Sequence, residues 1–287
     1  MPIIELKDVC FRYGKKSPYE IKALDKINLE IEENSITGLI GHTGSGKSTL
    51  VQMFNGLLKP ESGSVIVDGE DIWAKPKEIG KVRFKVGMVM QYPEYQLFAE
   101  TVKDDIAYGP KNMKLSQEEI NRRVARSIEF CGLSSDILEK SPFDLSGGQK
   151  RRVALAGVMA MEPKILVLDE PAAGLDPKGR REILGGIKKY REQSGTTVII
   201  VSHSMEDMAM YCDRVVVMSH SKILANGTCK DVFSNHQLLF DAGLDVPEIT
   251  NIVLALRKAG VSLPDDIYTV EGAFKALLDL KGGKNEL

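Results

Sequence analysis

The feature that most constrains this chain is a glycine-rich loop, Gly41-His-Thr-Gly-Ser-Gly-Lys-Ser-Thr49. Residues 35–40 before it form an apolar run of strand length, and residues 50–58 after it have the apolar spacing of a helix face. A strand, a glycine-rich loop and a helix in this order are the setting of a phosphate-binding loop. The pattern therefore predicts an α/β fold with a phosphate site at this loop. The residues that we expect to bind the phosphates are Gly41, His42, Thr43, Gly44, Ser45, Gly46, Lys47, Ser48 and Thr49.

The chemistry of the loop has a counterpart further along the chain. Lys47 can reach the β- and γ-phosphates of a nucleotide, and the Ser48 hydroxyl can ligate Mg²⁺. Residues 165–168 are an apolar run that ends in Asp169 and Glu170. Asp169 is placed to hold Mg²⁺ through water beside Ser48, and Glu170 is placed to polarise an attacking water or to accept its proton. Two acids at a strand end are often only solvated, but the phosphate loop favours the functional interpretation.

Composition limits the other classes of function. The 287 residues carry a net charge of -2, which argues against a protein that binds nucleic-acid backbones. The four cysteines lie far apart and form no CxxC pattern, so neither a zinc site nor a disulfide framework is indicated. The N-terminus lacks the layout of a signal peptide, and no apolar run approaches the ~20 residues of a membrane span. We therefore expect a protein that is soluble by itself and reaches a membrane only through partners.

The order of the patterns predicts the domain organisation. Strands alternate with helices over residues 1–235, which indicates a mostly parallel sheet with helices on both faces. A mostly helical insert occupies about residues 92–160, and a helix in it begins at Ser116-Gln-Glu-Glu119, which resembles a capping box. Residues 19–24 read as a polar connection between two early strands. Residues 236–287 predict a helical extension with two amphipathic helices.

A second motif, Leu145-Ser-Gly-Gly-Gln149, opens a helix in the insert. Ser146 can cap that helix, and the two glycines permit close approach of the backbone to an anion. With the phosphate loop, this pentapeptide resembles the ATP-binding cassette (ABC) family of ATPases. In that family two cassettes pair head to tail, and each ATP lies between the phosphate loop of one and this motif of the other. The resemblance implies that Ser146, Gly147, Gly148 and Gln149 contact ATP held by a second ATPase subunit, with Mg²⁺ as the metal.

The same resemblance assigns further positions. Tyr13 looks like the aromatic residue that stacks on adenine, with a half-exposed strand tyrosine as the alternative. Gln91 looks like the glutamine that senses the γ-phosphate and ligates Mg²⁺, and His203 looks like the histidine that contacts the γ-phosphate. Residues 174–176 look like the loop that crosses the interface between cassettes. The chain departs from many relatives at residues 172–173, where two alanines replace hydroxyl residues, which puts hydrogen bonding across that loop in doubt.

Within the ABC family, the chain resembles the ATPases of energy-coupling factor (ECF) importers, most of all the second of two paired ATPase paralogues. The resemblance rests on residues 92–102 (Tyr-Pro-Glu-Tyr-Gln-Leu-Phe-Ala-Glu-Thr-Val), residues 141–148, residues 174–180 and residues 244–250. It implies a pair of ATPases, below a membrane scaffold subunit and beside a substrate-binding membrane subunit. It further implies a peripheral protein on the cytoplasmic face of the cell membrane that powers uptake of vitamins or transition-metal ions.

Two apolar surfaces suit such partners. Tyr95, Leu97 and Phe98 are apolar residues in a polar loop that follows Gln91, so they can receive a membrane partner or, alternatively, pack into the core. The extension from residue 236 needs a place to bury four apolar side chains. We expect them to join two ATPases, and packing on the chain's own cassette is the alternative. These side chains are Leu254, Leu256, Phe274 and Leu277.

Other functions compete with transport. A soluble ABC ATPase, such as one for iron–sulfur assembly, has the same architecture, but residues 91–102 and the C-terminal extension disfavour it. A small-molecule kinase with a phosphate loop leaves residues 145–149 unexplained. The sequence therefore favours an ATP-hydrolysing subunit of an importer.

Overall fold

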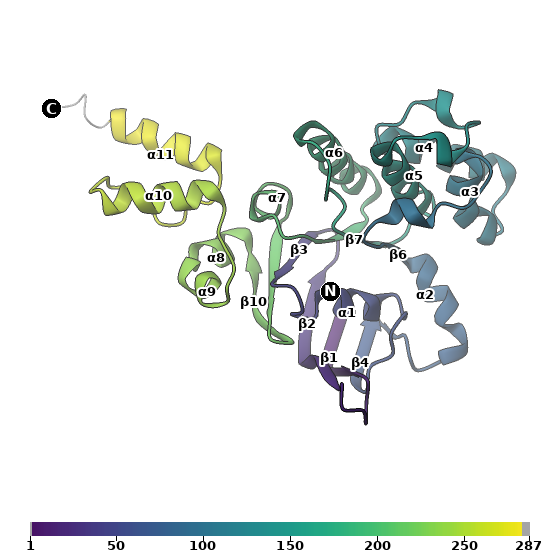
Figure 1. Cartoon of the computed structure of the whole chain (residues 1–287), viewed down its shortest axis with the longest axis horizontal. Helices are drawn as coiled ribbons and strands as arrows, with labels where there is room; N and C mark the ends of the chain where they lie inside the picture. Colours follow the sequence, from purple (N-terminus) through teal and green to yellow (C-terminus); the bar gives the residue numbers. More distant parts are fainter. Residues whose placement is uncertain (1, 283–287) are drawn as a thin grey trace.

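The structure is a computed structural model that describes residues 2–282, so residues 1 and 283–287 of the predicted domains lie outside it (Figure 1). Within the described residues the larger sheet has the strand order β10-β9-β3-β8-β7-β6. All neighbours pair in parallel except β10, which is antiparallel to β9. The predicted α/β class with a mostly parallel core sheet is confirmed. The strands are β3 (Ile36–Gly41), β6 (Val86–Val89), β7 (Ile165–Asp169), β8 (Thr197–Val201), β9 (Arg214–Ser219) and β10 (Lys222–Thr228).

The central strands explain why the sequence patterns there are apolar without alternation. Every residue of β3 and of β8 is buried, because helices cover one face of the sheet, and one helix together with a smaller antiparallel sheet covers the other. Parallel strands end at one edge of a sheet, and the loops after β3, β7 and β8 therefore lie together. Those loops carry the glycine-rich motif, the two acids and His203.

A smaller antiparallel sheet has the order β2-β1-β4-β5. Its strands are β1 (Pro2–Tyr13), β2 (Ile21–Glu32), β4 (Ser62–Val67) and β5 (Glu70–Asp71). Tyr13 pairs with Ile21, so the predicted polar connection over residues 19–24 is wrong beyond residue 20. Exposed Lys22 conceals the strand in the sequence, whereas Ala23 and Leu24 are buried.

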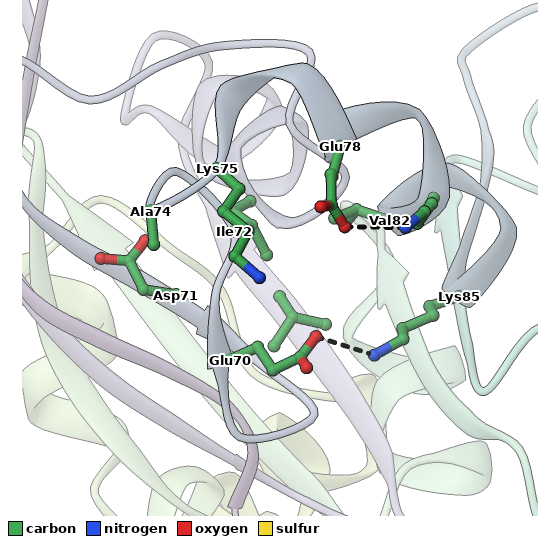
Figure 2. A pocket seen from close by; sticks show the side chains of 10 residues that line it. Glu70, Asp71, Ile72, Ala74, Lys75, Glu78, Val82 and Lys85 are labelled. Atoms are coloured by element: carbon green, nitrogen blue, oxygen red, sulfur yellow. Dashed lines mark hydrogen bonds and ion pairs between the residues drawn. The ribbon is translucent and has the colours of Figure 1, made fainter.

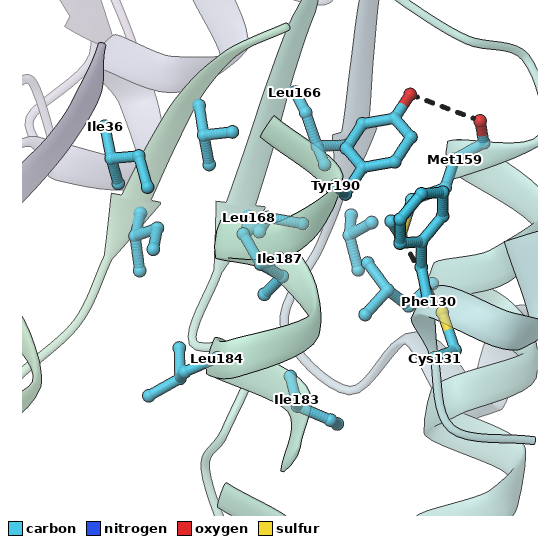
Figure 3. Packing of buried hydrophobic residues seen from close by; sticks show 14 of the residues in the cluster. Ile36, Phe130, Cys131, Met159, Leu166, Leu168, Ile183, Leu184, Ile187 and Tyr190 are labelled. Atoms are coloured by element: carbon cyan, nitrogen blue, oxygen red, sulfur yellow. Dashed lines mark hydrogen bonds between the residues drawn. The ribbon is translucent and has the colours of Figure 1, made fainter. Parts of the chain in front are cut away.

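Four helices pack around the large sheet: α1 (Lys47–Phe54), α2 (Ile79–Lys85), α6 (Pro177–Ser194) and α7 (Met205–Tyr211). Helix α1 ends four residues before the predicted end at residue 58. Figure 3 shows how α6 joins the helical insert: the Tyr190 ring lies edge-on to Phe130 at 5.1 Å, and its hydroxyl donates to the Met159 carbonyl at 3.4 Å. One apolar core thus runs from the sheet into the insert.

The helical insert lies where residues 92–160 predict it. It contains α3 (Val102–Asn112), α4 (Gln117–Phe130) and α5 (Gly147–Met159). Ser116 caps α4 by accepting from the Glu119 amide at 3.3 Å. The predicted capping box is only half formed, because the Glu119 carboxylate accepts from Arg122 and Arg123 at 2.7 Å instead.

The C-terminal region contains α8 (Cys229–Ser234), α9 (His236–Asp241), α10 (Glu248–Lys258) and α11 (Val270–Gly282). Leu239 and Val246 are buried in the same core as the sheet, so the packing of the cassette continues past the predicted boundary at residue 235. Helices α10 and α11 have a small core of their own. In Figure 1 they lie at the end of the molecule opposite α3 and α4.

Candidate functional site

A cavity of ≈ 350 Å³ lies at the carboxyl edge of the parallel strands, where ligands of open α/β sheets bind. Most of the residues predicted for the phosphates and the metal line it, together with Tyr13. The lining is Tyr13, Ile21, Ala23, Thr43, Gly44, Gly46, Lys47, Ser48, Thr49, Gln91, Asp169, Glu170, Val201 and His203. Parts of the chain 190 residues apart are thus joined in one polar site.

The backbone of the loop shows why glycine is required there. A Cβ on Gly41 would lie 2.3 Å from the Met218 carbonyl oxygen, and one on Gly46 would lie 2.3 Å from that of Ala23. Both glycines also have positive φ angles, of 155° and 104°. No side chain of the described residues caps α1 at Gly46, so its first N–H groups stay open to an anion.

Lys47 is held toward the phosphate site by the loop itself. Its Nζ donates to the Gly41 carbonyl at 2.7 Å and to the His42 carbonyl at 3.1 Å. Burial lowers the pKa of Lys47, while Glu170 and Asp169 oppose that shift by favouring the ammonium. A buried cation between two acids is suited to bind a phosphate.

The oxygen atoms beside Lys47 fit a magnesium ion. The Ser48 hydroxyl donates to Asp169 Oδ2 at 3.3 Å, and the Gln91 side chain lines the same cavity. A hydroxyl, a carboxylate and an amide are hard oxygen ligands, and Mg²⁺ typically takes one or two of these together with substrate phosphates.

Glu170 has a strained backbone and a buried, unpaired oxygen. Its φ of 53° lies in the left-handed region, and its Oε1 is buried without a hydrogen-bond partner among the described residues. The nearest base is His203, whose Nε2 is 3.6 Å from Oε1. Burial, and then the neighbouring Asp169, raise the pKa of Glu170. Burial, and then Lys47, lower the pKa of His203. A buried carboxylate with one unpaired oxygen, held in this way, is a candidate general base.

Tyr13 stands at the open side of the cavity. Its side chain is 43% exposed, its hydroxyl lies 3.2 Å from Thr49 Oγ1, and its ring meets Phe11 edge-on at 4.9 Å. The ring is therefore fixed yet has a free face. Ile21 and Ala23 beside it were missed, because the sequence reading placed them in a connection rather than in β2.

The second motif lies elsewhere on the chain. Ser146 and Gln149 form a capping box at the start of α5, and with Gly148 they line a different cavity of ≈ 720 Å³ with residues 174–176. Gly147 is exposed, with open space at its Cα within the described chain. The structure therefore does not bring residues 146–149 to the phosphate loop of the same chain. Each chain carries two half-sites on separate surfaces.

A cavity of ≈ 270 Å³ beside β5 and α2 lacks these features (Figure 2). Four of its six charged residues pair with each other: Lys85 Nζ lies 3.3 Å from Glu70, and Lys81 Nζ lies 2.7 Å from Glu78. Because these charges are already compensated, the cavity does not compete with the phosphate site as the functional centre.

The fold and the two half-sites define an ATP-binding cassette. The ABC transporter family matches residues 24–173, and the chain belongs to that family. Within the family, it belongs with the ATP-binding proteins of energy-coupling factor transporters. The EcfA2 protein of Clostridium perfringens is 50% identical over 283 residues, covering 98% of this chain and 99% of that protein. The EcfA2 protein of Acetivibrio thermocellus is 52% identical over 275 residues, 96% of this chain and 97% of that protein.

Solved structures agree with this assignment. CbiO1 of Clostridium perfringens, described as part of the ABC transporter complex CbiONQ, matches with a TM-score of 0.75 and 38% identity over 88% of this chain and 98% of that chain. The cassette MJ0796, solved as a post-hydrolysis dimer with ADP and phosphate, matches with a TM-score of 0.71 and 30% identity over 79% of this chain and 98% of that chain. The chain is the ATP-binding and ATP-hydrolysing subunit of an ECF-type importer. The soluble iron–sulfur alternative is not favoured.

Proposed function

We propose that this subunit works by closing head to tail with a second ATPase subunit, so that ATP joins the phosphate loop of one to residues 145–149 of the other. The observation that carries this proposal is the separation of the two half-sites into different cavities of one chain. The dimeric form of the cassette MJ0796 supports it.

In the closed pair, Lys47 binds the β- and γ-phosphates, and the open N–H groups of α1 surround them. Ser48, Gln91 and Asp169 hold Mg²⁺, which supplies charge neutralisation for the transferred phosphoryl group. Tyr13 stacks on adenine through its free face. The contacts that support these roles are the shared cavity and the Ser48–Asp169 hydrogen bond.

Glu170 acts as the general base toward the attacking water, and His203 and Gln91 orient that water and the γ-phosphate. The unpaired Oε1 of Glu170 and its position 3.6 Å from His203 Nε2 support this division. A base with a raised pKa takes a proton from water more readily than an ordinary carboxylate.

Closure of the pair acts on a membrane scaffold subunit, which lies beside a substrate-binding membrane subunit. No helix in residues 2–282 is long and apolar enough to cross a membrane. The likeness to ATP-binding proteins of energy-coupling factor transporters supports a place for the protein at the cytoplasmic face of the membrane, as a peripheral subunit. The docking segment, residues 92–98, supports this role because Tyr95 is 85% exposed and Phe98 is 61% exposed. Leu97 instead packs against the chain's own core.

The head-to-tail pairing is tested at Ser146. Aspartate and asparagine both cap helices, so Ser146→Asp and Ser146→Asn keep α5, but only the carboxylate repels a γ-phosphate. The probe is sedimentation of the chain with ATP, alone and with its partner ATPase, in a Glu170→Gln background. We expect ATP-driven pairing with Ser146→Asn and its loss with Ser146→Asp, while ATP affinity of the single chain is unchanged. Pairing by Ser146→Asp equal to that of Ser146→Asn contradicts the proposal.

A further inference from the structure

A buried arginine joins the two loops that flank the nucleotide site. Arg151 is the fifth residue of α5 and is only 5% exposed. Its Nε and Nη2 each donate at 3.1 Å to one oxygen of Glu94, in the docking segment. Its Nη1 donates to the carbonyl of Ala173, in the loop after β7. One rigid guanidinium, carried by α5, therefore binds two other segments of the chain.

Both partners of Arg151 lie close in sequence to a residue that faces the γ-phosphate side of the site. Glu94 is three residues after Gln91, in the 3₁₀ turn Pro93–Gln96. Ala173 closes a turn that begins at Glu170, since its amide donates to the Glu170 carbonyl at 3.2 Å. Tyr92 and Glu170 both have left-handed backbones, with φ angles of 57° and 53°. Conformations that cost free energy persist only where surrounding contacts hold them.

The contact with Ala173 also concerns residues 172–173, where this chain has alanines and many relatives have hydroxyl residues. Alanines at residues 172–173 have no side-chain hydroxyl to hold this loop. The Arg151 guanidinium holds it instead through a backbone carbonyl, which no side-chain pattern in the loop reveals. Lysine cannot replace this arrangement, because an ammonium is a point charge without the planar fork that binds a carboxylate and a carbonyl together.

We infer that Arg151 is a positioning residue, which fixes the turn behind Glu170 and makes the position of that turn depend on the docking segment. Movement of Glu94 by a docked partner is then transmitted through one guanidinium to the catalytic carboxylate. The inference rests on the proposed role of Glu170. It adds a residue that touches neither ATP nor the partner and still sets the rate of hydrolysis.

The test uses the assembled transporter with Arg151→Lys, Glu94→Gln and the double variant. We expect ATP affinity and KM within about twofold of wild type, while kcat falls by about tenfold for the turnover that depends on this chain's site. Glu170→Gln in the same assembly measures how much turnover that is. If Arg151 and Glu94 act as one link, the double variant loses no more than Arg151→Lys alone.

Arg123 provides the matched control. It is also a mostly buried guanidinium. It donates to Glu119 at 2.7 Å and to the Met161 carbonyl at 2.8 Å and pairs with Glu162 at 3.3 Å, so its contacts stay within the insert and the turn directly after it. Arg123→Lys should lower the melting temperature as Arg151→Lys does, with kcat per folded site unchanged. Equal kcat for Arg151→Lys and Arg123→Lys would reduce Arg151 to a structural role and overturn the inference. Multiplying losses in the double variant also overturn it.

The two proposals fail separately in this experiment. If Glu170→Gln keeps wild-type hydrolysis, the role of Glu170 is wrong whatever Arg151 does. If Glu170→Gln is inactive while Arg151→Lys is fully active, only the link is wrong.

Discussion

At the scale of the residue, Glu170 combines features that lower the stability of the folded protein and that therefore indicate a function. A buried, unpaired carboxylate oxygen next to a second acid disfavours the folded state. Glutamine has the same shape without the charge and cannot accept the proton of the attacking water. Glu170→Gln should therefore bind ATP normally, lose most turnover and accumulate as a closed pair filled with ATP. Hydrolysis rates and nucleotide binding check this, and hydrolysis at the wild-type rate would remove Glu170 from the mechanism.

In a second prediction, two substitutions at Tyr13 distinguish the contribution of its ring to ATP binding from that of its hydroxyl. Base stacking on an aromatic ring is worth about 1–3 kcal/mol, so Tyr13→Ala should raise the apparent KM for ATP by roughly tenfold. The hydroxyl lies 3.2 Å from Thr49 Oγ1 at a half-exposed position, where its loss should matter little. Tyr13→Phe should therefore resemble wild type. Equal effects of the two substitutions would assign the role to the hydroxyl.

At the scale of the element, a variant that tests the docking segment has to leave Leu97 unchanged, although the sequence groups Leu97 with Tyr95 and Phe98. Leu97 is partly buried against the main core, so its replacement by serine would disturb folding. Tyr95 and Phe98 are exposed, and each can contribute about 1.5–3 kcal/mol when a partner buries it. The double variant Tyr95→Ser, Phe98→Ser should bind ATP normally, co-purify poorly with the scaffold subunit and lose uptake. Full assembly and uptake would place the dock elsewhere.

The sequence predicts elements best where chemistry or burial dictates the pattern. The motif residues Lys47, Asp169 and His203 line one cavity, because each lies at or after the end of a buried parallel strand. Helix α2 was missed, since none of its residues is fully buried and its apolar face is short, with only Ile79 and Val82 packed against the core. Arg151 was missed as well, because both of its partners are distant in sequence and one is a backbone carbonyl.

At the scale of the whole molecule, α10 and α11 present an apolar face that their own core does not use. Their small core buries Val253, Leu263, Ile267 and Ala273. Five large apolar side chains remain between 44% and 64% exposed: Ile252, Val270, Phe274, Leu277 and Leu278. The prediction that Leu254, Phe274 and Leu277 join two ATPases is therefore retained as a proposal, whereas Leu256 packs within the extension.

The exposed face predicts a weak pair in the absence of nucleotide. Each of these side chains is already about half buried, so each can add roughly half of the 1.5–3 kcal/mol that full burial contributes. The upper end of their sum, about 4–8 kcal/mol, exceeds the cost of association, about 4 kcal/mol or more, by about 4 kcal/mol, which corresponds to a dissociation constant of about 1 mM. Pairing should therefore be detectable by ultracentrifugation at high concentration of the nucleotide-free ATPases.

A truncation that tests this pairing has to leave the cassette intact. A cut after Ser234 would remove Leu239 and Val246 from the main core, whereas a chain that ends at Val246 keeps both. The chain that ends at Val246 should bind ATP and fail to pair without nucleotide. Because it also loses the stack of Tyr268 on Phe233, the full-length variant Phe274→Ser, Leu278→Ser serves as its control. This variant alters only exposed positions and should lose the same pairing at an unchanged melting temperature. If both proteins still pair without nucleotide, another surface holds the ATPases together, and the extension packs only against the cassette of its own chain.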